Sequence, residues 1–154
     1  MNNQETPTIN NLGSASWVAQ ITGYEEVIYK LTEFDVPEVS TGTTPIGNAT
    51  EFTLQETGDH MVYENLELTF LVDENLNNYR KLHEWMRKNT HEGTATTQSV
   101  FISFMTNGKQ FQGVELEFIY AFPIGLSKLS LDTNGDTTDL KCTVTFAYTL
   151  FDFV

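Results

Sequence analysis

The sequence predicts a mainly β protein: a sandwich or barrel of antiparallel strands with one flanking α-helix. Short runs in which apolar and polar residues alternate recur along the chain, and turn residues separate them. A single stretch, within residues 73–89, has the period of an amphipathic helix instead. Several strands at short spacing around one inserted helix are typical of a β-sandwich or barrel.

The predicted helix follows directly from a strand at residues 66–72. Asp73 is a good N-cap residue, and Asn89 is suited to a left-handed stop at the other end. We therefore expect the helix to lie on the sheet through one apolar stripe, formed by Leu76, Tyr79, Leu82, His83 and Met86.

Three helix residues outside this stripe are candidates for a subunit interface. Trp85 lies on the flank, where two interpretations stand: it packs on its own sheet, or it belongs to an interface with a neighbouring chain, since Trp is enriched at interfaces. Arg80 and Arg87 lie on the shoulder of the helix, and we expect them to be offered to acids of a neighbouring subunit.

The remaining strands are expected in hairpins. Residues 16–22 and 27–32 alternate on either side of a turn at Gly23. Residues 100–105 and 112–122 flank an Asn-Gly pair, which is a strong hairpin signal. Short strands at 51–55 and 60–63, and two strands around Asn134-Gly135 with the second running from Leu140 to Leu150, complete the set.

Two segments lack strand or helix periodicity. Residues 1–15 predict a flexible or partner-ordered N-terminal arm. Residues 35–50 contain two prolines and two glycines and predict a long loop, which is uncommon inside a compact domain unless it has a function. We expect this loop to reach another subunit, with Val36, Val39 and Ile46 as candidate interface residues.

The composition fits one domain over residues 1–154 and restricts its partners. The net charge of −13 argues against wrapping nucleic acid, because phosphate binding needs clustered Lys and Arg. On composition alone, the charge is that of an acidic protein kept soluble by its charge. No signal peptide and no apolar segment of membrane-spanning length is visible, so we expect no membrane. The lone Cys142 is expected to be a small buried hydrophobe.

The sequence contains no pattern that predicts catalysis, a metal or a cofactor. None of the three histidines has a metal-ligand spacing, and His83 on the apolar stripe is expected to be a core residue. The start of a calcium loop is resembled by Asp132, Asn134 and Asp136. However, Thr137 and Thr143 stand where its glycine and glutamate belong, which favours a β-turn. We predict that the protein is not an enzyme.

Three glutamates are candidates for an acidic wall. Glu115 and Glu117 share the strand face opposite an apolar row, and Glu67 has the same relation to its own strand.

Two stretches carry a resemblance to a known family. They are GDHMVYENLELTFLVDENLNNYRKLHEWM, a strand leading into a helix with Tyr79 and Trp85, and FIYAFPIGLSKLSLDTNGDTTDLKCTVTFAYTLFDF, which ends in aromatic residues. Their order resembles the tail tube proteins of contractile-tailed bacteriophages. Related folds form baseplate tube-initiator rings and the tube of type VI secretion.

The resemblance implies a structural virion protein that forms hexameric rings. These rings stack into a tube, and DNA passes through its acidic lumen during ejection. Glu67, Glu115 and Glu117 are then candidates to line the lumen, and the alternative that they face solvent on the outside remains open. It implies that the partners are the chain itself, the tail sheath, the baseplate and the tail terminator, and that the protein is located in the virion tail after assembly in the host bacterial cytoplasm. The alternatives are a tube-initiator ring and a monomeric β-sandwich binding module.

Overall fold

The computed structural model describes residues 17–24, 30–47, 51–93, 95–105, 111–135 and 138–154. Within them the chain forms nine strands and one helix, which confirms the predicted fold class. The N-terminal arm predicted at residues 1–15 lies outside the described residues. The elements are β1 (Trp17–Ile21), β2 (Lys30–Phe34), β3 (Val39–Ile46), β4 (Leu54–Tyr63), β5 (Leu66–Leu71), α1 (Asn77–Glu92), β6 (Gln98–Met105), β7 (Phe111–Leu126), β8 (Lys141–Ala147) and β9 (Leu150–Phe153).

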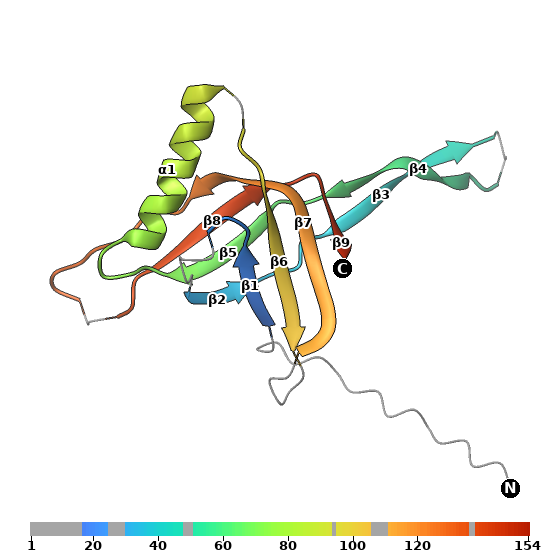
Figure 1. Cartoon of the computed structure of the whole chain (residues 1–154). Coiled ribbons are helices and arrows are strands. Elements are labelled where there is room, and N and C mark those ends of the chain that lie inside the picture. Colours follow the sequence, from blue (N-terminus) through green and yellow to red (C-terminus); the bar gives the residue numbers. More distant parts are fainter. Residues whose placement is uncertain (1–16, 25–29, 48–50, 94, 106–110, 136–137) are drawn as a thin grey trace, which may run out of the picture.

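Seven strands form one antiparallel sheet that folds over itself at β7. The first part of β7 lies between β6 and β9, and its second part pairs with β8. The layer β1-β6-β7-β9, called here the front layer, thus packs over the layer β2-β5-β8, called the back layer (Figure 1). At the bend Tyr120 has a positive φ of 56°, which returns Ala121 to the core. The predicted alternation along β7 is therefore broken at this residue.

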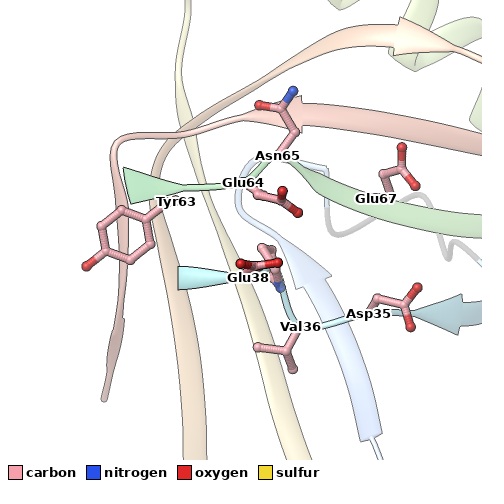
Figure 2. A pocket seen from close by; sticks show the side chains of 8 residues that line it. Asp35, Val36, Glu38, Tyr63, Glu64, Asn65 and Glu67 are labelled. Atoms are coloured by element: carbon pink, nitrogen blue, oxygen red, sulfur yellow. The ribbon is translucent and has the colours of Figure 1, made fainter. Parts of the chain in front are cut away.

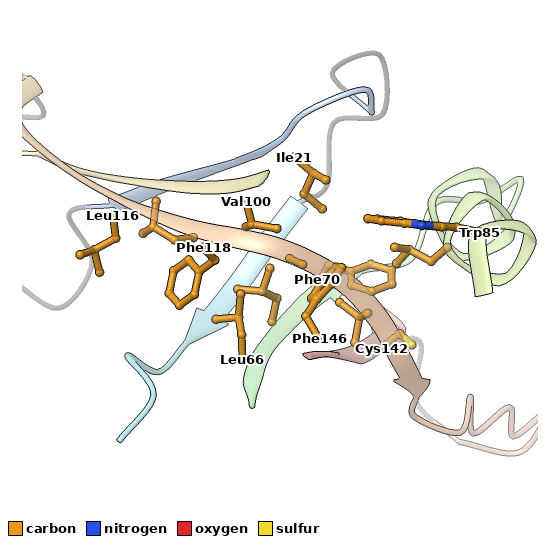
Figure 3. Close-up of a cluster of buried hydrophobic side chains, with 14 residues drawn as sticks. Ile21, Leu66, Phe70, Trp85, Val100, Leu116, Phe118, Cys142 and Phe146 are labelled. Atoms are coloured by element: carbon orange, nitrogen blue, oxygen red, sulfur yellow. The ribbon is translucent and has the colours of Figure 1, made fainter. Parts of the chain in front are cut away.

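The core fills the space between the two layers. Alternate residues of β5 and β8 face those of β6 and β7 (Figure 3). Because successive strand residues point to opposite faces, the side chains between them point outward from each layer. The largest fully buried side chains are Phe70, Phe118 and Phe146. Cys142 belongs to this cluster, as predicted.

The helix starts and ends later than the sequence predicted. Leu76 adopts a left-handed conformation just before it, and no side chain caps the first turn. Instead Asn78, fully buried, accepts hydrogen bonds at Oδ1 from the backbone N–H of Asp73 (3.2 Å) and of Tyr79 (2.9 Å). The helix continues past Asn89 to a left-handed Gly93. Its buried residues are Asn78, Leu82 and Trp85, whereas Leu76 and His83 of the predicted stripe are exposed.

Much of the predicted loop at 35–50 is instead a strand. β3 pairs with β4 in a two-stranded hairpin that projects from the body (Figure 1). A register shift between Thr41 and Thr43 accommodates Gly42, and each strand of a two-stranded hairpin has an open side, where a proline such as Pro45 is tolerated. The two short strands predicted at 51–55 and 60–63 are one continuous strand, β4.

Three other sequence expectations are corrected. β1 and β2 do not pair with each other, since β1 pairs with β6 and β2 with β5. Residues 127–135 and 138–140 contain no strand, because β7 itself continues through Pro123 to Leu126. The last predicted strand is interrupted at Tyr148 and Thr149, and β9 then crosses to the front layer. The hairpin of β6 and β7 is confirmed, although its turn lies outside the described residues.

Candidate functional site

The outward face of the front layer carries acids held by hydroxyl groups. Ser103 Oγ donates a hydrogen bond to Glu115 Oε2 (2.7 Å), and Ser99 Oγ donates one to Glu117 Oε1 (2.8 Å). These bonds fix both carboxylates against β6 and keep them partly exposed. Asp152 lies directly opposite Glu117 on β9, so a third carboxylate shares this face. We call Glu115, Glu117 and Asp152 the acidic wall.

The third predicted glutamate of the wall lies elsewhere. Glu67 pairs with Thr145 on β8 and points outward from the back layer. Because the two layers face each other across the core, the structure does not bring Glu67 to the face that holds Glu115 and Glu117. Sequence periodicity could show only that each glutamate lies opposite an apolar row, and not which layer carries it.

Glu67 instead contributes to an acidic cleft at the base of the hairpin. The cleft has a volume of about 650 Å³ and is lined by the segment before β3 and the junction of β4 with β5 (Figure 2). Glu64 donates its backbone N–H to the carbonyl of Glu38 (3.0 Å), which holds these two strand ends together. The acidic cleft is defined by its four carboxylates, Asp35, Glu38, Glu64 and Glu67.

The sequence missed this cleft as a unit because its acids come from two segments separated by the hairpin. Beside it lies an aromatic cluster in which Tyr63 packs edge to face against Tyr148 and Phe151. The Tyr148 hydroxyl is buried and has no hydrogen-bond partner among the described residues. Burial, with Tyr63 and Glu64 nearby, raises the pKa of Tyr148 to about 12.

The candidate interface residues of α1 divide into two kinds. Trp85 is only 2% exposed: its ring stacks on Tyr24 at 4.8 Å, and Nε1 donates to the carbonyl of Thr96 (2.7 Å). The structure agrees with the interpretation in which Trp85 packs on its own molecule. Almost no indole surface is left for a neighbour. Arg80 and Arg87 are exposed, and Arg80 pairs with Glu84 at 3.0 Å.

The candidate residues near the hairpin lie just before β3 and at the two ends of that strand. Val36 and Ile46 are exposed and Val39 is partly buried. Ile46 lies opposite Leu54 near the far end of the hairpin, where Phe52 is 73% exposed. This gathering of apolar side chains on an arm without a core of its own was not visible when the segment was interpreted as a loop.

The described residues present no site of recognisable catalytic or metal chemistry. No group of three His, Cys, Asp or Glu side chains among them could hold a metal ion. At the turn that resembled a calcium loop, Asn134 donates its backbone N–H to Asp132 Oδ1 (2.9 Å), which is an Asx turn. In the described part of the chain, no helix is long and apolar enough to cross a membrane.

Comparison with solved structures relates this architecture to contractile injection systems. A chain of the anti-feeding prophage cap, which terminates its tube, is 16% identical with a TM-score of 0.74, covering 97% of this chain and 95% of that one. A chain of the sheath/tube terminator of the PVC extracellular contractile injection system is 15% identical with a TM-score of 0.73, covering 96% and 99%. This protein has the same fold.

The likeness extends to type VI secretion. Hcp1 from Flavobacterium johnsoniae is 15% identical with a TM-score of 0.51, and the match covers 90% of this chain and 94% of that one. No protein-family model and no curated protein matches the sequence. The fold is thus shared with these chains at low sequence identity.

Proposed function

We propose that the protein is a tail tube subunit, a structural protein whose hexameric rings stack into a hollow tube. The observation that carries the proposal is the front layer. Its outermost strands, β1 and β9, each have a paired strand on one side alone among the described residues. Unpaired strand edges favour association, and pairing β9 of one copy with β1 of the next would remove both edges around a closed ring.

The projecting hairpin supports stacking of such rings. A two-stranded hairpin is only marginally stable by itself, and this one exposes Ile46, Phe52 and Leu54 toward its far end. A contact with the next ring would bury these side chains and order the arm. Val36 and Val39, at the other end of β3, would then belong to the same contact surface.

The acidic wall supports a lumen that carries DNA without binding it. Glu115 and Glu117 repeat by sixfold symmetry as twelve carboxylates, and Asp152 adds six more. Negative charge of this density repels phosphates within about 8 Å at physiological salt. The hydrogen bonds from Ser99 and Ser103 hold two of the carboxylates of each subunit in place.

The proposed partners follow from the place of a tube in such particles. They are other copies of the chain within and between rings, the sheath around the tube, the baseplate at one end and the terminator at the other. Similar chains occur in a sheath-tube complex and in a baseplate, with TM-scores of 0.66 and 0.63. We propose a location in the virion tail, with assembly in the host bacterial cytoplasm.

Negative-stain microscopy and sedimentation of the purified protein test the proposal. A tube subunit forms hexameric rings, or tubes with the diameter of one such ring. The assembled fraction rises with protein concentration. A discrete monomer at the highest soluble concentration would instead favour a β-sandwich binding module.

A ring at one end of the tube is a second candidate. The TM-scores of 0.74 and 0.73 to chains of cap and terminator structures exceed the 0.66 to a chain of the sheath-tube complex. A terminal or initiator ring should assemble as single or paired rings and stop. A repeating subunit should give tubes whose length grows with protein concentration.

A further inference from the structure

The exposed side of α1 is a positive region on an acidic protein. The helix contains four basic and two acidic residues, while the whole chain has eight basic residues and a net charge of −13. Arg80 is paired with Glu84. Lys81, Arg87 and Lys88 are exposed and have no ion pair with any described residue. We call these three residues the cationic face.

The acidic cleft is the matching surface on the same chain. Its lining includes four carboxylates and no basic side chain. Within the described residues, the one ion pair outside α1 is Lys141 with Glu33, and neither residue lines the cleft. Carboxylates gathered without a cation repel one another and give the cleft a local negative potential.

One molecule does not bring its own two surfaces together. The cleft lies at the start of β5, and α1 follows from the opposite end of that strand. Six residues of strand span about 20 Å. In Figure 1 the helix and the hairpin base lie at different ends of the body, so the charges of one surface remain available to another molecule.

We propose that the cationic face docks into the acidic cleft of a second copy of this chain. The contact joins two different patches, so it is heterologous and propagates from copy to copy into a ring or a filament. This inference rests on the proposed function, because a ring of identical subunits repeats the same contact around its axis. It adds to that function the residues that form a contact between subunits. Complementary charges also steer the encounter and fix its register.

Charge reversal with rescue tests the contact. The helix variant has Arg87→Glu and Lys88→Glu, and the cleft variant has Glu38→Lys and Glu64→Lys. Each variant alone places like charges at the contact and should associate about tenfold more weakly than the wild type. An equimolar mixture restores opposite charges at every contact and should recover assembly in sedimentation velocity.

A matched control carries the same charge change elsewhere. Asp132 and Asp139 are exposed in the segment between β7 and β8, outside the cleft. Asp132→Lys with Asp139→Lys should assemble normally alone and should not rescue the helix variant. Normal assembly of both contact variants, or equal rescue by this control, would overturn the docking proposal. Circular dichroism of each variant verifies that the monomer remains folded.

Cysteine cross-linking gives a readout that does not depend on ring formation. The native Cys142 is only 1% exposed, so it does not compete with surface thiols. A mixture of Lys88→Cys and Glu64→Cys chains should oxidise mainly to heterodimers, whereas Lys88→Cys with Asp139→Cys should not. If cross-linking gives selective heterodimers but the wild-type protein forms no rings, the tube function is refuted and the docking contact is not. Tubes without selective heterodimers would refute the docking contact alone.

Discussion

At the scale of single residues, Asn78 links the end of β5 to the start of α1. Its Nδ2 donates to the carbonyl of Leu71 (2.8 Å), and its Oδ1 accepts from the two backbone N–H groups described above. An asparagine is usually unfavourable inside a helix because it competes with backbone hydrogen bonds. Here the same hydrogen-bonding capacity provides partners for backbone groups at the junction of β5 and α1, where the left-handed Leu76 offers no side-chain cap.

We predict that Asn78→Ala is strongly destabilising. The substitution leaves buried backbone donors and an acceptor without partners, which should lower the free energy of unfolding by about 2 kcal/mol or more. Urea unfolding measures this loss. The control is Asn77→Ala at the neighbouring exposed position, which should change stability by no more than about 0.5 kcal/mol. Equal effects of the two substitutions would contradict the role assigned to Asn78.

Tyr148 predicts an alkaline dependence of stability. Its pKa is raised to about 12 from the ordinary value of 10, because burial and nearby groups disfavour the charged phenolate. The folded state therefore holds the proton more tightly than the unfolded state. The resulting stabilisation is complete below pH 10 and is lost as the pH rises from 10 toward 12.

We expect Tyr148→Phe to remove part of this alkaline loss. The hydroxyl has no partner among the described residues, so stability at pH 7 should be unchanged or slightly higher. Thermal unfolding followed from pH 8 to 11.5 compares the two proteins. Some alkaline loss remains in the variant, because burial and Glu84 also raise the pKa of Tyr24. Parallel curves for variant and wild type would show that Tyr148 is not responsible.

At the scale of elements, the sequence predicted the type and order of most elements because local patterns determine them. The alternation in β5 and β8 and the helical period in α1 are local, and so is the Asn-Gly signal before β7. Pairing partners are not local: β1 meets β6 about 80 residues later in the chain, so the turn at Gly23 suggested the wrong partner. The acidic wall was only partly predictable for the same reason: Glu115 and Glu117 share a strand, whereas Asp152 comes from β9.

The hairpin also shows where turn residues mislead. Gly42 and Gly58 face each other where the two strands cross, and a Cβ on Gly58 would lie 2.6 Å from the Gly42 carbonyl oxygen. Gly58 is therefore required by close backbone approach at the register shift between the two strands, and it does not mark a loop.

We predict that Gly58→Ala distorts the hairpin and weakens assembly. A contact of 2.6 Å with backbone cannot be relieved by rotating a side chain, so the strands must separate. Sedimentation should show fewer assembled particles, with the body still folded because no core residue lies in the hairpin. The control is Gly42→Ala, whose added Cβ has no atom within 4 Å. Identical behaviour of the two variants would contradict this account of the crossing.

The bend of β7 at Tyr120 leads to a second prediction about an element. A left-handed conformation costs a residue with a Cβ about 1 kcal/mol, and glycine avoids this cost. Tyr120 is 62% exposed, so little packing is lost on truncation. Tyr120→Gly should therefore be more stable than Tyr120→Ala by about 1 kcal/mol in urea unfolding, which reverses the usual order within strands. The usual order would show that the bend does not require positive φ.

At the scale of the whole molecule, the two layers give the protein two different outward faces. The front layer carries the acidic wall, and the back layer carries Glu67 at the edge of the acidic cleft. Among the described residues, the outer sides of β1 and β9 have no paired strand, and the wall lies on the layer that these two strands border. The proposed closure of that layer into a ring would gather its carboxylates on one continuous surface. Under the docking proposal, the cleft and the cationic face then remain as complementary surfaces for a contact between subunits.

This separation of faces leads to a prediction about the lumen. Reversing the wall with Glu115→Lys and Glu117→Lys should leave the monomer folded, because both side chains are only partly buried and point away from the core. The tubes formed should bind DNA in a filter-binding assay, and salt should weaken that binding, as expected for contacts with phosphates. Virions assembled with the variant should eject DNA slowly or not at all.

The control with Asp132→Lys and Asp139→Lys carries the same added charge outside the front layer. It should leave ejection unchanged, and if both pairs slow ejection equally, the wall does not line the lumen.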